Sequence, residues 1–243
     1  FSSPFDKASV DLLESLETPF FKIASPEITD IDLIEYSASK GKPIIISTGI
    51  ATKEDISLCI KTIRSTGNDK IIILKCVSSY PAPIEESNLI MIQEYKKEFK
   101  VLTGLSDHTL TNLSAIAAVS LGACMIEKHL ILDKSVGGPD ASFSLDEKEF
   151  KFLVDSIRMT ELAIGEKQYK LSNSQLKSKQ YSRSLYIVEH VVKGEIITKE
   201  NVRSIRPGFG LHPKYYKSIL GGKFKDSYEK GTRLKLDYIE YNS

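Results

Sequence analysis

Short aliphatic and β-branched runs alternate with amphipathic stretches through the first 165 residues, and this alternation restricts the fold more than any other feature. The predicted strands are residues 1–3, 20–25, 43–48, 70–79, 100–106 and 124–132. The predicted helices lie near residues 7–16, 29–40, 52–65, 88–99, 111–121 and 146–164. Strands that alternate with helices of this length indicate βαβ units and a parallel sheet.

Residues typical of helix ends support this division. Thr52 stands where an N-cap is expected, and Asp55 lies three positions later, as in a capping box with Asp in place of Glu. Gly41 and Gly122 follow predicted helices, where glycine commonly ends a helix.

The number of units and the character of the strand ends point to a barrel. Six strand–helix units suit a doubly wound open sheet, whereas a (β/α)₈ barrel needs eight units and about 250 residues. Every predicted strand, however, ends in polar residues: Ser3, Ser25, Ser47, Ser78, Ser106 and His129. The carboxyl ends of barrel strands surround one mouth, while an open sheet concentrates its site at one switch point. We therefore expect an α/β, TIM-type barrel whose first two units would precede Phe1, forming a domain over residues 1–165.

The sequence changes character after this domain. Residues 166–181 are polar and without periodicity, which predicts a linker. Residues 182–243 place Lys193-Gly194 and Lys230-Gly231 before two similar alternating apolar runs. This faint repeat predicts a small β-rich module, which is near the lower size limit for independent stability and should dock on something.

Composition excludes several classes of partner. Lys and Arg number 33 against 32 Asp and Glu, so no nucleic-acid surface is expected. No run approaches the roughly 18 apolar residues of a membrane span, and no signal peptide is expected. Cys59, Cys76 and Cys124 lie in apolar runs without framework spacing, which indicates reduced thiols and a cytoplasmic location.

His108 and His129 are the sharpest candidates for chemistry. Each lies at a predicted strand end, in consecutive units. Adjacent parallel strands are about 4.8 Å apart, so the two imidazoles could share a metal, although they could also be satisfied core histidines. Ser106 shares a strand face with His108, and Glu127 shares one with His129. Two histidines without a thiolate suit exchangeable Mn²⁺, Mg²⁺ or Co²⁺.

Lys22 is a charged residue inside an apolar strand. It either meets an anionic ligand at the barrel mouth or extends to the edge of the sheet. Ser25 and Ser47, at neighbouring strand ends, could donate to phosphate or carboxylate oxygens. The loop "SSYPAP", which contains Tyr80, is stiffened by two prolines and could equally be a plain turn.

Six segments together carry a resemblance to a known family. In chain order these are "FKIASPE", "STG", "SSYPAP", "GLSDHT", "EKH" and "GGPDASFSL". They resemble the sialic acid synthases, which condense phosphoenolpyruvate with an amino-sugar aldehyde. The tail, with "SRSL", "VVKGEIIT" and "IRPGFG", resembles the antifreeze-like (SAF) domain of that family. Ser78-Ser79-Tyr80 and the double-glycine segment most resemble the pseudaminic acid synthases.

The resemblance implies a substrate and a role for individual residues. The substrate would be a 2,4-diacetamido-2,4,6-trideoxy altro-hexose. The metal would lie on His108 and His129. Phosphoenolpyruvate would contact Lys22, Ser25, Ser47, Ser78 and Ser106, with Glu27, Tyr80 and Glu127 at the reaction centre. Ser3 stands at a strand end where relatives have Thr or Ser, and Asp140 would face the sugar.

The resemblance also implies an assembly. Arg206 matches an arginine that reaches the neighbouring subunit's site, so we expect a homodimer with swapped C-terminal domains, unless Arg206 merely occupies an exposed loop of its own. The alternatives for function are an N-acetylneuraminate or legionaminate synthase, and a non-catalytic sugar-binding module.

Overall fold

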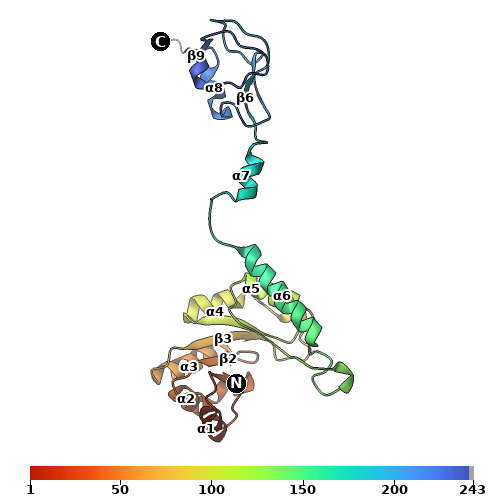
Figure 1. Cartoon of the computed structure of the whole chain (residues 1–243). Coiled ribbons are helices and arrows are strands. Elements are labelled where there is room, and N and C mark those ends of the chain that lie inside the picture. Colours follow the sequence, from red (N-terminus) through yellow and green to blue (C-terminus); the bar gives the residue numbers. More distant parts are fainter. Residues whose placement is uncertain (241–243) are drawn as a thin grey trace. The chain divides into compact units, whose positions relative to one another are not determined.

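The computed structural model describes residues 1–240 (Figure 1). The chain divides into two compact units, Phe1–Glu166 and Lys167–Ser243, and each is described by itself.

The first unit is built on a five-stranded parallel sheet in the order β1-β2-β3-β4-β5. The strands are β1 (Phe21–Ile23), β2 (Ile44–Ser47), β3 (Ile71–Cys76), β4 (Leu102–Asp107) and β5 (Ile126–Lys128). Spatial order equals chain order, so each strand pairs with the next one along the chain. All five carboxyl ends therefore lie at the same edge of the sheet.

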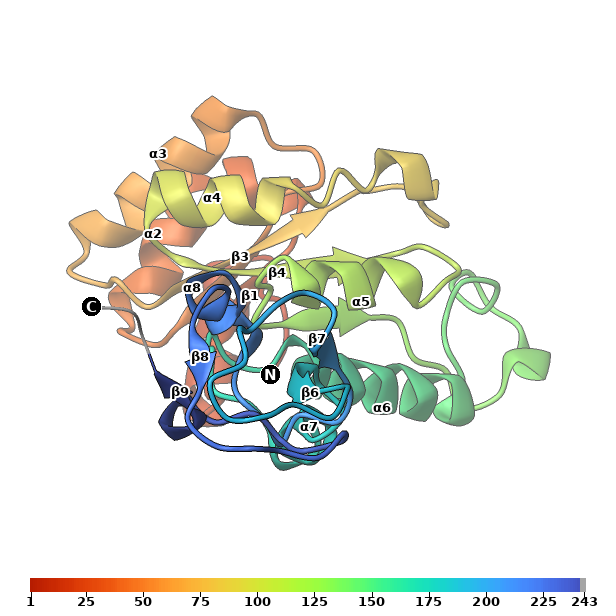
Figure 2. The ribbon, with the colours of Figure 1, turned by 90° about the horizontal axis from the view of Figure 1, so that it is seen from above.

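Helices connect the strands, and their ends follow the predicted signals. They are α1 (Lys7–Ser15), α2 (Ile31–Ser39), α3 (Lys53–Ser65), α4 (Met91–Phe99), α5 (Leu113–Ser120) and α6 (Glu147–Ile164). Thr52 and Asp55 form the predicted capping box at the start of α3. Gly41 and Gly122 have φ of +72° and +96°, the left-handed conformation expected after a helix. Figure 2 shows α3 and α4 on one side of β3.

Side chains alternate between the two faces of the sheet. One face meets the helices: Phe21 and Ile23 of β1, with Ile44 and Ile46 of β2, join residues of α1–α3 in the main core. On β4, Leu105 packs with Ile92 of α4 and Ala118 of α5. Because successive strand residues point to opposite faces, the residues between these face away from the helices. They include Lys22, Ser47, Cys76, Ser106 and Glu127.

The architecture of the first unit matches the sequence expectation except at its edges. The parallel sheet with its connecting helices agrees with part of a TIM-type barrel, and a separate small unit follows it in the chain. Residues 1–3 are not a strand, although the Ser2 carbonyl accepts a 3.4 Å hydrogen bond from the Lys22 amide. The last strand is much shorter than predicted, and beyond it Leu130 forms an isolated parallel bridge with Leu145.

The second unit begins with α7 (Asn173–Lys179), a short helix in the segment predicted to be a linker without regular structure. Two antiparallel strand pairs follow: β6 (Ser184–Ile187) with β7 (Val202–Ile205), and β8 (Lys223–Phe224) with β9 (Ile239–Glu240). A short helix, α8 (Tyr216–Ile219), lies between them. Their apolar side chains enclose a core of their own around Phe224. Gly194 and Gly231, the glycines of the repeat, have φ of +82° and +89°.

Within residues 1–240, every helix is too short or too polar to cross a bilayer.

Candidate active site

Four of the five strands, β1, β2, β4 and β5, carry a connected group of polar side chains on the face away from the helices. Lys22 Nζ donates to Ser47 Oγ at 2.8 Å and lies 3.3 Å from Glu127 Oε1. Ser106 Oγ donates to the same carboxylate oxygen at 2.7 Å. The Lys22 side chain is only 7% exposed, so its charge is compensated by Glu127 rather than by water.

The sequence predicted that Lys22 meets an anionic ligand or extends to the edge of the sheet, and the structure shows a different arrangement. It does not extend to the sheet edge, because it is buried and paired. The partner that the sequence left unnamed is Glu127, which the parallel sheet places near it across the inside of the curve. The pairing of Ser106 with Glu127 follows from the register, in which these two residues are neighbours on β4 and β5.

Ser25 and Ser78 come together beside Gly49. Ser25 Oγ accepts a 3.0 Å hydrogen bond from the Ile50 amide. A Cβ on Gly49 would overlap the Ser78 hydroxyl and lie 2.9 Å from Ser25 Oγ, so only glycine fits between the two serines. Ser78 Oγ is buried and has no hydrogen-bond partner within residues 1–240. A buried hydroxyl without a partner is costly, which is a reason to expect a ligand oxygen there.

Glu27 lies in a 3₁₀ turn, residues Pro26–Thr29, directly after β1. Its Oε2 atom is buried and, in the part of the chain that the structure describes, without a donor. Ser3 is half-buried, and no side-chain hydrogen bond of Ser3 is found in the same residues. Glu27 therefore has a buried oxygen that a ligand could satisfy, whereas Ser3 has no such feature in the described residues.

The two histidines are neighbours, with ring centroids 5.3 Å apart. His108 Nδ1 lies 2.8 Å from the Val77 carbonyl oxygen. Since a carbonyl only accepts, this nitrogen carries the proton and Nε2 of the neutral ring keeps its lone pair. Burial lowers the pKa of His108, while the hydrogen bond to Val77 acts in the opposite direction and is weaker. His129 Nδ1 lies 3.4 Å from Asp140 Oδ2, in the loop that the sequence assigned to the sugar.

Two aromatic rings lie beside the histidines. The Tyr80 ring is 4.3 Å from the His108 ring and 5.9 Å from the His129 ring, centroid to centroid. Phe143 lies 5.1 Å from His129 and 5.5 Å from Tyr80. The loop that contains Tyr80 is held in place by the Ala82 amide, which donates to the His108 carbonyl at 2.9 Å.

Three residues of this region were not predicted from the sequence as part of a site. Cys76 ends β3 with its Sγ 4.0 Å from His108 Nδ1, and burial raises the pKa of its thiol. Asp107 and Lys128 form a buried ion pair of 2.7 Å on the opposite, helix-facing side of the sheet. Alternation along each strand could have placed Cys76 on the face of Ser106, and Asp107 opposite His108.

Arg206 lies in the second unit and is exposed. Its loop is well anchored: Ser184 Oγ donates to the Pro207 carbonyl at 2.6 Å and accepts from the Gly210 amide at 2.9 Å. The structure therefore fixes the loop but does not relate Arg206 to the strand-end residues.

Two family profiles match the chain, one for each unit. Residues 1–169 match the NeuB family, and residues 182–240 match the SAF domain. The chain belongs to the NeuB family. The pseudaminic acid synthase of Helicobacter pylori is 46% identical over 241 residues, which are 99% of this chain and 71% of that protein. The N,N'-diacetyllegionaminic acid synthase of Legionella pneumophila is 38% identical over 244 residues, 98% of this chain and 68% of its own length.

A solved structure has a similar fold. The spore coat polysaccharide biosynthesis protein SpsE of Bacillus subtilis aligns with all of this chain and 74% of its own, at a TM-score of 0.66 and 33% identity. The family match and the two synthase relatives show that the chain is a synthase, an enzyme of the transferase type.

Proposed function

We propose that this NeuB-family chain condenses phosphoenolpyruvate with a 2,4-diacetamido-2,4,6-trideoxy altro-hexose and water, giving pseudaminic acid and phosphate. The observation that carries the proposal is the bonded group of buried Lys22, Ser47 and Ser106 with the half-buried Glu127. It lies beside the Ser78 hydroxyl, which has no partner within residues 1–240. One buried cation surrounded by hydroxyl donors suits a small, strongly anionic substrate. The greater identity to a pseudaminic than to a legionaminic acid synthase supports the choice of sugar.

Phosphoenolpyruvate would occupy the strand ends. Its anionic groups would take hydrogen bonds from Ser25, Ser47, Ser78 and Ser106. Lys22 would supply the charge, and its attraction to the substrate would compete with its attraction to Glu127, 3.3 Å away. A ligand at this position would also offer a partner to Ser78 Oγ. Charge compensation by Glu127 explains how Lys22 stays buried without a ligand.

The two histidines fit a divalent metal ion. His108 is fixed with its proton on Nδ1, and His129 has a carboxylate near its own Nδ1, which is the usual arrangement around metal-binding imidazoles. Within residues 1–240 no group of three or more His, Cys, Asp or Glu side chains is placed to hold a metal. The proposed site therefore has two protein ligands and leaves positions for water and substrate, as exchangeable Mn²⁺, Mg²⁺ or Co²⁺ would need.

The chemistry then divides between the metal and the protein. When bound, the cation would act as a Lewis acid on the aldehyde oxygen of the open-chain sugar. The methylene carbon of phosphoenolpyruvate attacks the aldehyde carbon, water adds at C2, and phosphate leaves by C–O cleavage. Lys22 and the serines hold the phosphoenolpyruvate, Asp140 and Tyr80 contact the sugar, and Glu27 and Glu127 are placed to accept or return protons. Holding both substrates at one mouth supplies a further part of the rate.

We further propose that the second unit completes the site of another subunit in a homodimer with swapped C-terminal domains. The anchored loop around Arg206 supports this, since a planar guanidinium suits the carbonyl and carboxylate oxygens of the sugar. Cys59 and Cys76 are buried, whereas Cys124 is exposed. The reactants and the two buried thiols suit a cytoplasmic enzyme.

A side-by-side assay tests the choice of sugar. The protein is given phosphoenolpyruvate, Mn²⁺ and either the trideoxy diacetamido altro-hexose, its legionaminate-type isomer or N-acetylmannosamine. We expect kcat/KM for the altro sugar to exceed the others by at least about tenfold, a difference of about 1.4 kcal/mol in transition-state binding. A preference for N-acetylmannosamine or the isomer would instead support the N-acetylneuraminate or legionaminate alternative. Turnover with none of the three would support the non-catalytic sugar-binding module.

A further inference from the structure

We propose that Asp107 and Lys128 are positioning residues, which act through the backbone to hold His108 and His129 at the separation that a shared metal requires. This inference rests on the proposed metal site. Each member of the pair directly precedes one histidine: Asp107 ends β4 before His108, and Lys128 ends β5 before His129. The register makes the two residues direct neighbours across the sheet.

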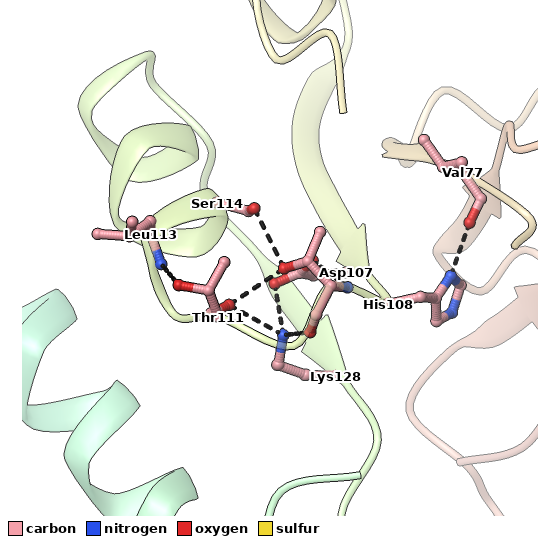
Figure 3. Close-up of polar contacts among 8 residues, drawn as sticks. Val77, Asp107, His108, Thr111, Leu113, Ser114 and Lys128 are labelled. Atoms are coloured by element: carbon pink, nitrogen blue, oxygen red, sulfur yellow. Dashed lines mark hydrogen bonds and ion pairs between the residues drawn. The ribbon is translucent and has the colours of Figure 1, made fainter. Parts of the chain in front are cut away.

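The pair is buried and tightly bonded. The Lys128 and Asp107 side chains are 1% and 2% exposed, and Lys128 Nζ lies 2.7 Å from Asp107 Oδ2. Lys128 Nζ also donates to the Thr109 and Thr111 carbonyls, at 2.7 and 3.3 Å. These contacts, drawn in Figure 3, satisfy all three ammonium hydrogens.

The bonds join β5 to the segment that follows β4. Asp107 Oδ1 accepts from the Thr109 amide at 3.0 Å, which closes a turn around His108. The Thr109 hydroxyl then contacts Ser114 of α5 at 3.2 Å, so the turn is also tied to the next helix. In Figure 3 the Asp107 side chain points toward Lys128 while that of His108 points the opposite way, toward Val77. The pair thus fixes the backbone on both sides of His108 without entering the site.

Burying two charges is a costly way to join two strands, because a pair of apolar residues could pack there with equal or greater stability. An ion pair differs from an apolar contact in its fixed distance and direction. Across the sheet that fixed geometry sets where the following residues, His108 and His129, leave their strands. Their ring centroids, 5.3 Å apart, depend on the ends of β4 and β5 keeping this spacing.

The test compares Asp107→Ala and Asp107→Asn with Asn68→Ala. Asn68 is also buried, and its side-chain nitrogen bonds the Ala38 and Lys42 carbonyls at the amino ends of the strands, so its loss destabilises the fold far from the histidines. Asn at position 107 keeps the shape and an oxygen for Lys128. Denaturant unfolding first measures the stability of each variant, so that variants of similar stability are compared. Lys128→Met replaces Asp107→Ala in the comparison if Asp107→Ala does not fold.

The first readout is Mn²⁺ affinity, measured from the spectrum of free Mn²⁺. We expect affinity to fall about 10- to 100-fold in Asp107→Ala, as for other groups that orient metal ligands, and less in Asp107→Asn. The Asn68→Ala protein should bind Mn²⁺ like the unchanged protein. Unchanged affinity in folded Asp107→Ala and Lys128→Met would overturn the inference.

The second readout needs no metal. Nitrogen NMR of the metal-free protein reports the tautomer and surroundings of each imidazole. We expect the His108 and His129 signals to shift in Asp107→Ala and to stay in place in Asn68→Ala. If the unchanged protein failed to bind Mn²⁺ while these signals shifted as described, the proposed metal function would fall and the positioning role would stand. Unshifted signals would remove the positioning role.

Discussion

The residues at the strand ends are held mainly by one another. Lys22, Ser47, Ser106 and Glu127 form one bonded group, in which the buried Lys22 ammonium faces the half-buried Glu127 carboxylate. Two atoms, Ser78 Oγ and Glu27 Oε2, are buried and, within residues 1–240, lack partners. Buried polar atoms are usually paired. A bound substrate would therefore contribute most by forming hydrogen bonds with these two atoms.

Replacement of Lys22 tests the anion site. In Lys22→Met the Glu127 carboxylate loses its cation, 3.3 Å away, and a phosphoenolpyruvate anion would meet an uncompensated negative charge. We expect kcat/KM for phosphoenolpyruvate to fall at least about 100-fold, roughly 2.7 kcal/mol, with little change in the KM for the sugar.

Lys40→Met is the matched control, because Lys40 pairs with the partly exposed Asp11 and Glu14, lies over the Tyr36 ring and is outside the site. Steady-state kinetics with each substrate varied in turn separates the effects. Equal kcat/KM values in the Lys22 and Lys40 variants would show that Lys22 has only a structural role.

Burial of His108 should make the stability of the metal-free protein depend on pH. Burial lowers the pKa of His108 below its ordinary 6.5, so the folded state favours the neutral ring. As pH falls below 6.5, the unfolded chain takes up a proton that folded His108 resists, and the free energy of unfolding decreases. An NMR titration should place the midpoint of His108 below 6.5, and His108→Gln should reduce the loss of stability between pH 7 and 5. A midpoint at or above 6.5 would contradict this account.

Much of the site could be predicted because strand alternation and polar strand ends are visible in the sequence. His108 was predicted from its place at a strand end, and alternation puts Ser106 on the face of His108 and Glu127 on the face of His129. The pairing of Lys22 with Glu127 could not be predicted, because it spans the curve of the sheet between residues 105 positions apart. Asp107 was missed for a different reason: it stands among polar residues of the strand end, and alternation, which places it on the face opposite His108, was not applied to it.

At the scale of elements, the connection between β2 and α3 lies against the loop that follows β3. This contact sets the positions of the Ser25 and Ser78 hydroxyls. Gly49 leaves room for the Ser25 and Ser78 hydroxyls, and a methyl group there would overlap Ser78. We expect Gly49→Ala to raise the KM for phosphoenolpyruvate about tenfold or more. It should also lower stability, because the added methyl group would lie 2.9 Å from the Ser78 backbone nitrogen, although this φ is not left-handed.

The control for Gly49→Ala is Gly41→Ala. A Cβ on Gly41 meets no atom within 4 Å, but its φ of +72° strains any other residue. We expect this variant to lose about 1 kcal/mol of stability and keep its KM. Thermal unfolding together with steady-state kinetics measures both quantities. A Gly49→Ala protein with normal KM would show that the two serines do not act together.

Elements with long periodic patterns were predicted well, and those at the edges were not. The capping box fixes the start of α3, whereas residues 1–3 lie beside β1 without a regular ladder. The helix α7 was missed because its residues lack an apolar stripe, and its cap, formed by Ser172 and Gln175, is its main signal.

At the scale of the whole molecule, the proposed exchange of C-terminal units predicts how mixed dimers behave. Arg206→Ala and His129→Ala should each abolish most activity. In a mixed dimer with swapped units, one site would contain both defects and the other neither, so mixing should restore part of the activity.

Without exchange of the units, each site of the mixed dimer contains one defect and mixing restores nothing. Sedimentation of the unchanged protein should show a dimer. A monomer with full activity would exclude the swap, and two Arg206→Ala preparations mixed together provide the control for nonspecific recovery.

The central claim is that the chain joins phosphoenolpyruvate to an amino-sugar aldehyde, and product analysis tests it most directly. The protein is incubated with phosphoenolpyruvate, the trideoxy diacetamido altro-hexose and Mn²⁺, and the products are measured by mass spectrometry and a phosphate assay. The account predicts a nine-carbon acid with the mass of pseudaminic acid, equimolar phosphate, and neither product when the sugar is omitted. Phosphate released without the sugar, or no nine-carbon acid from any amino sugar under conditions in which the protein is folded, would contradict it.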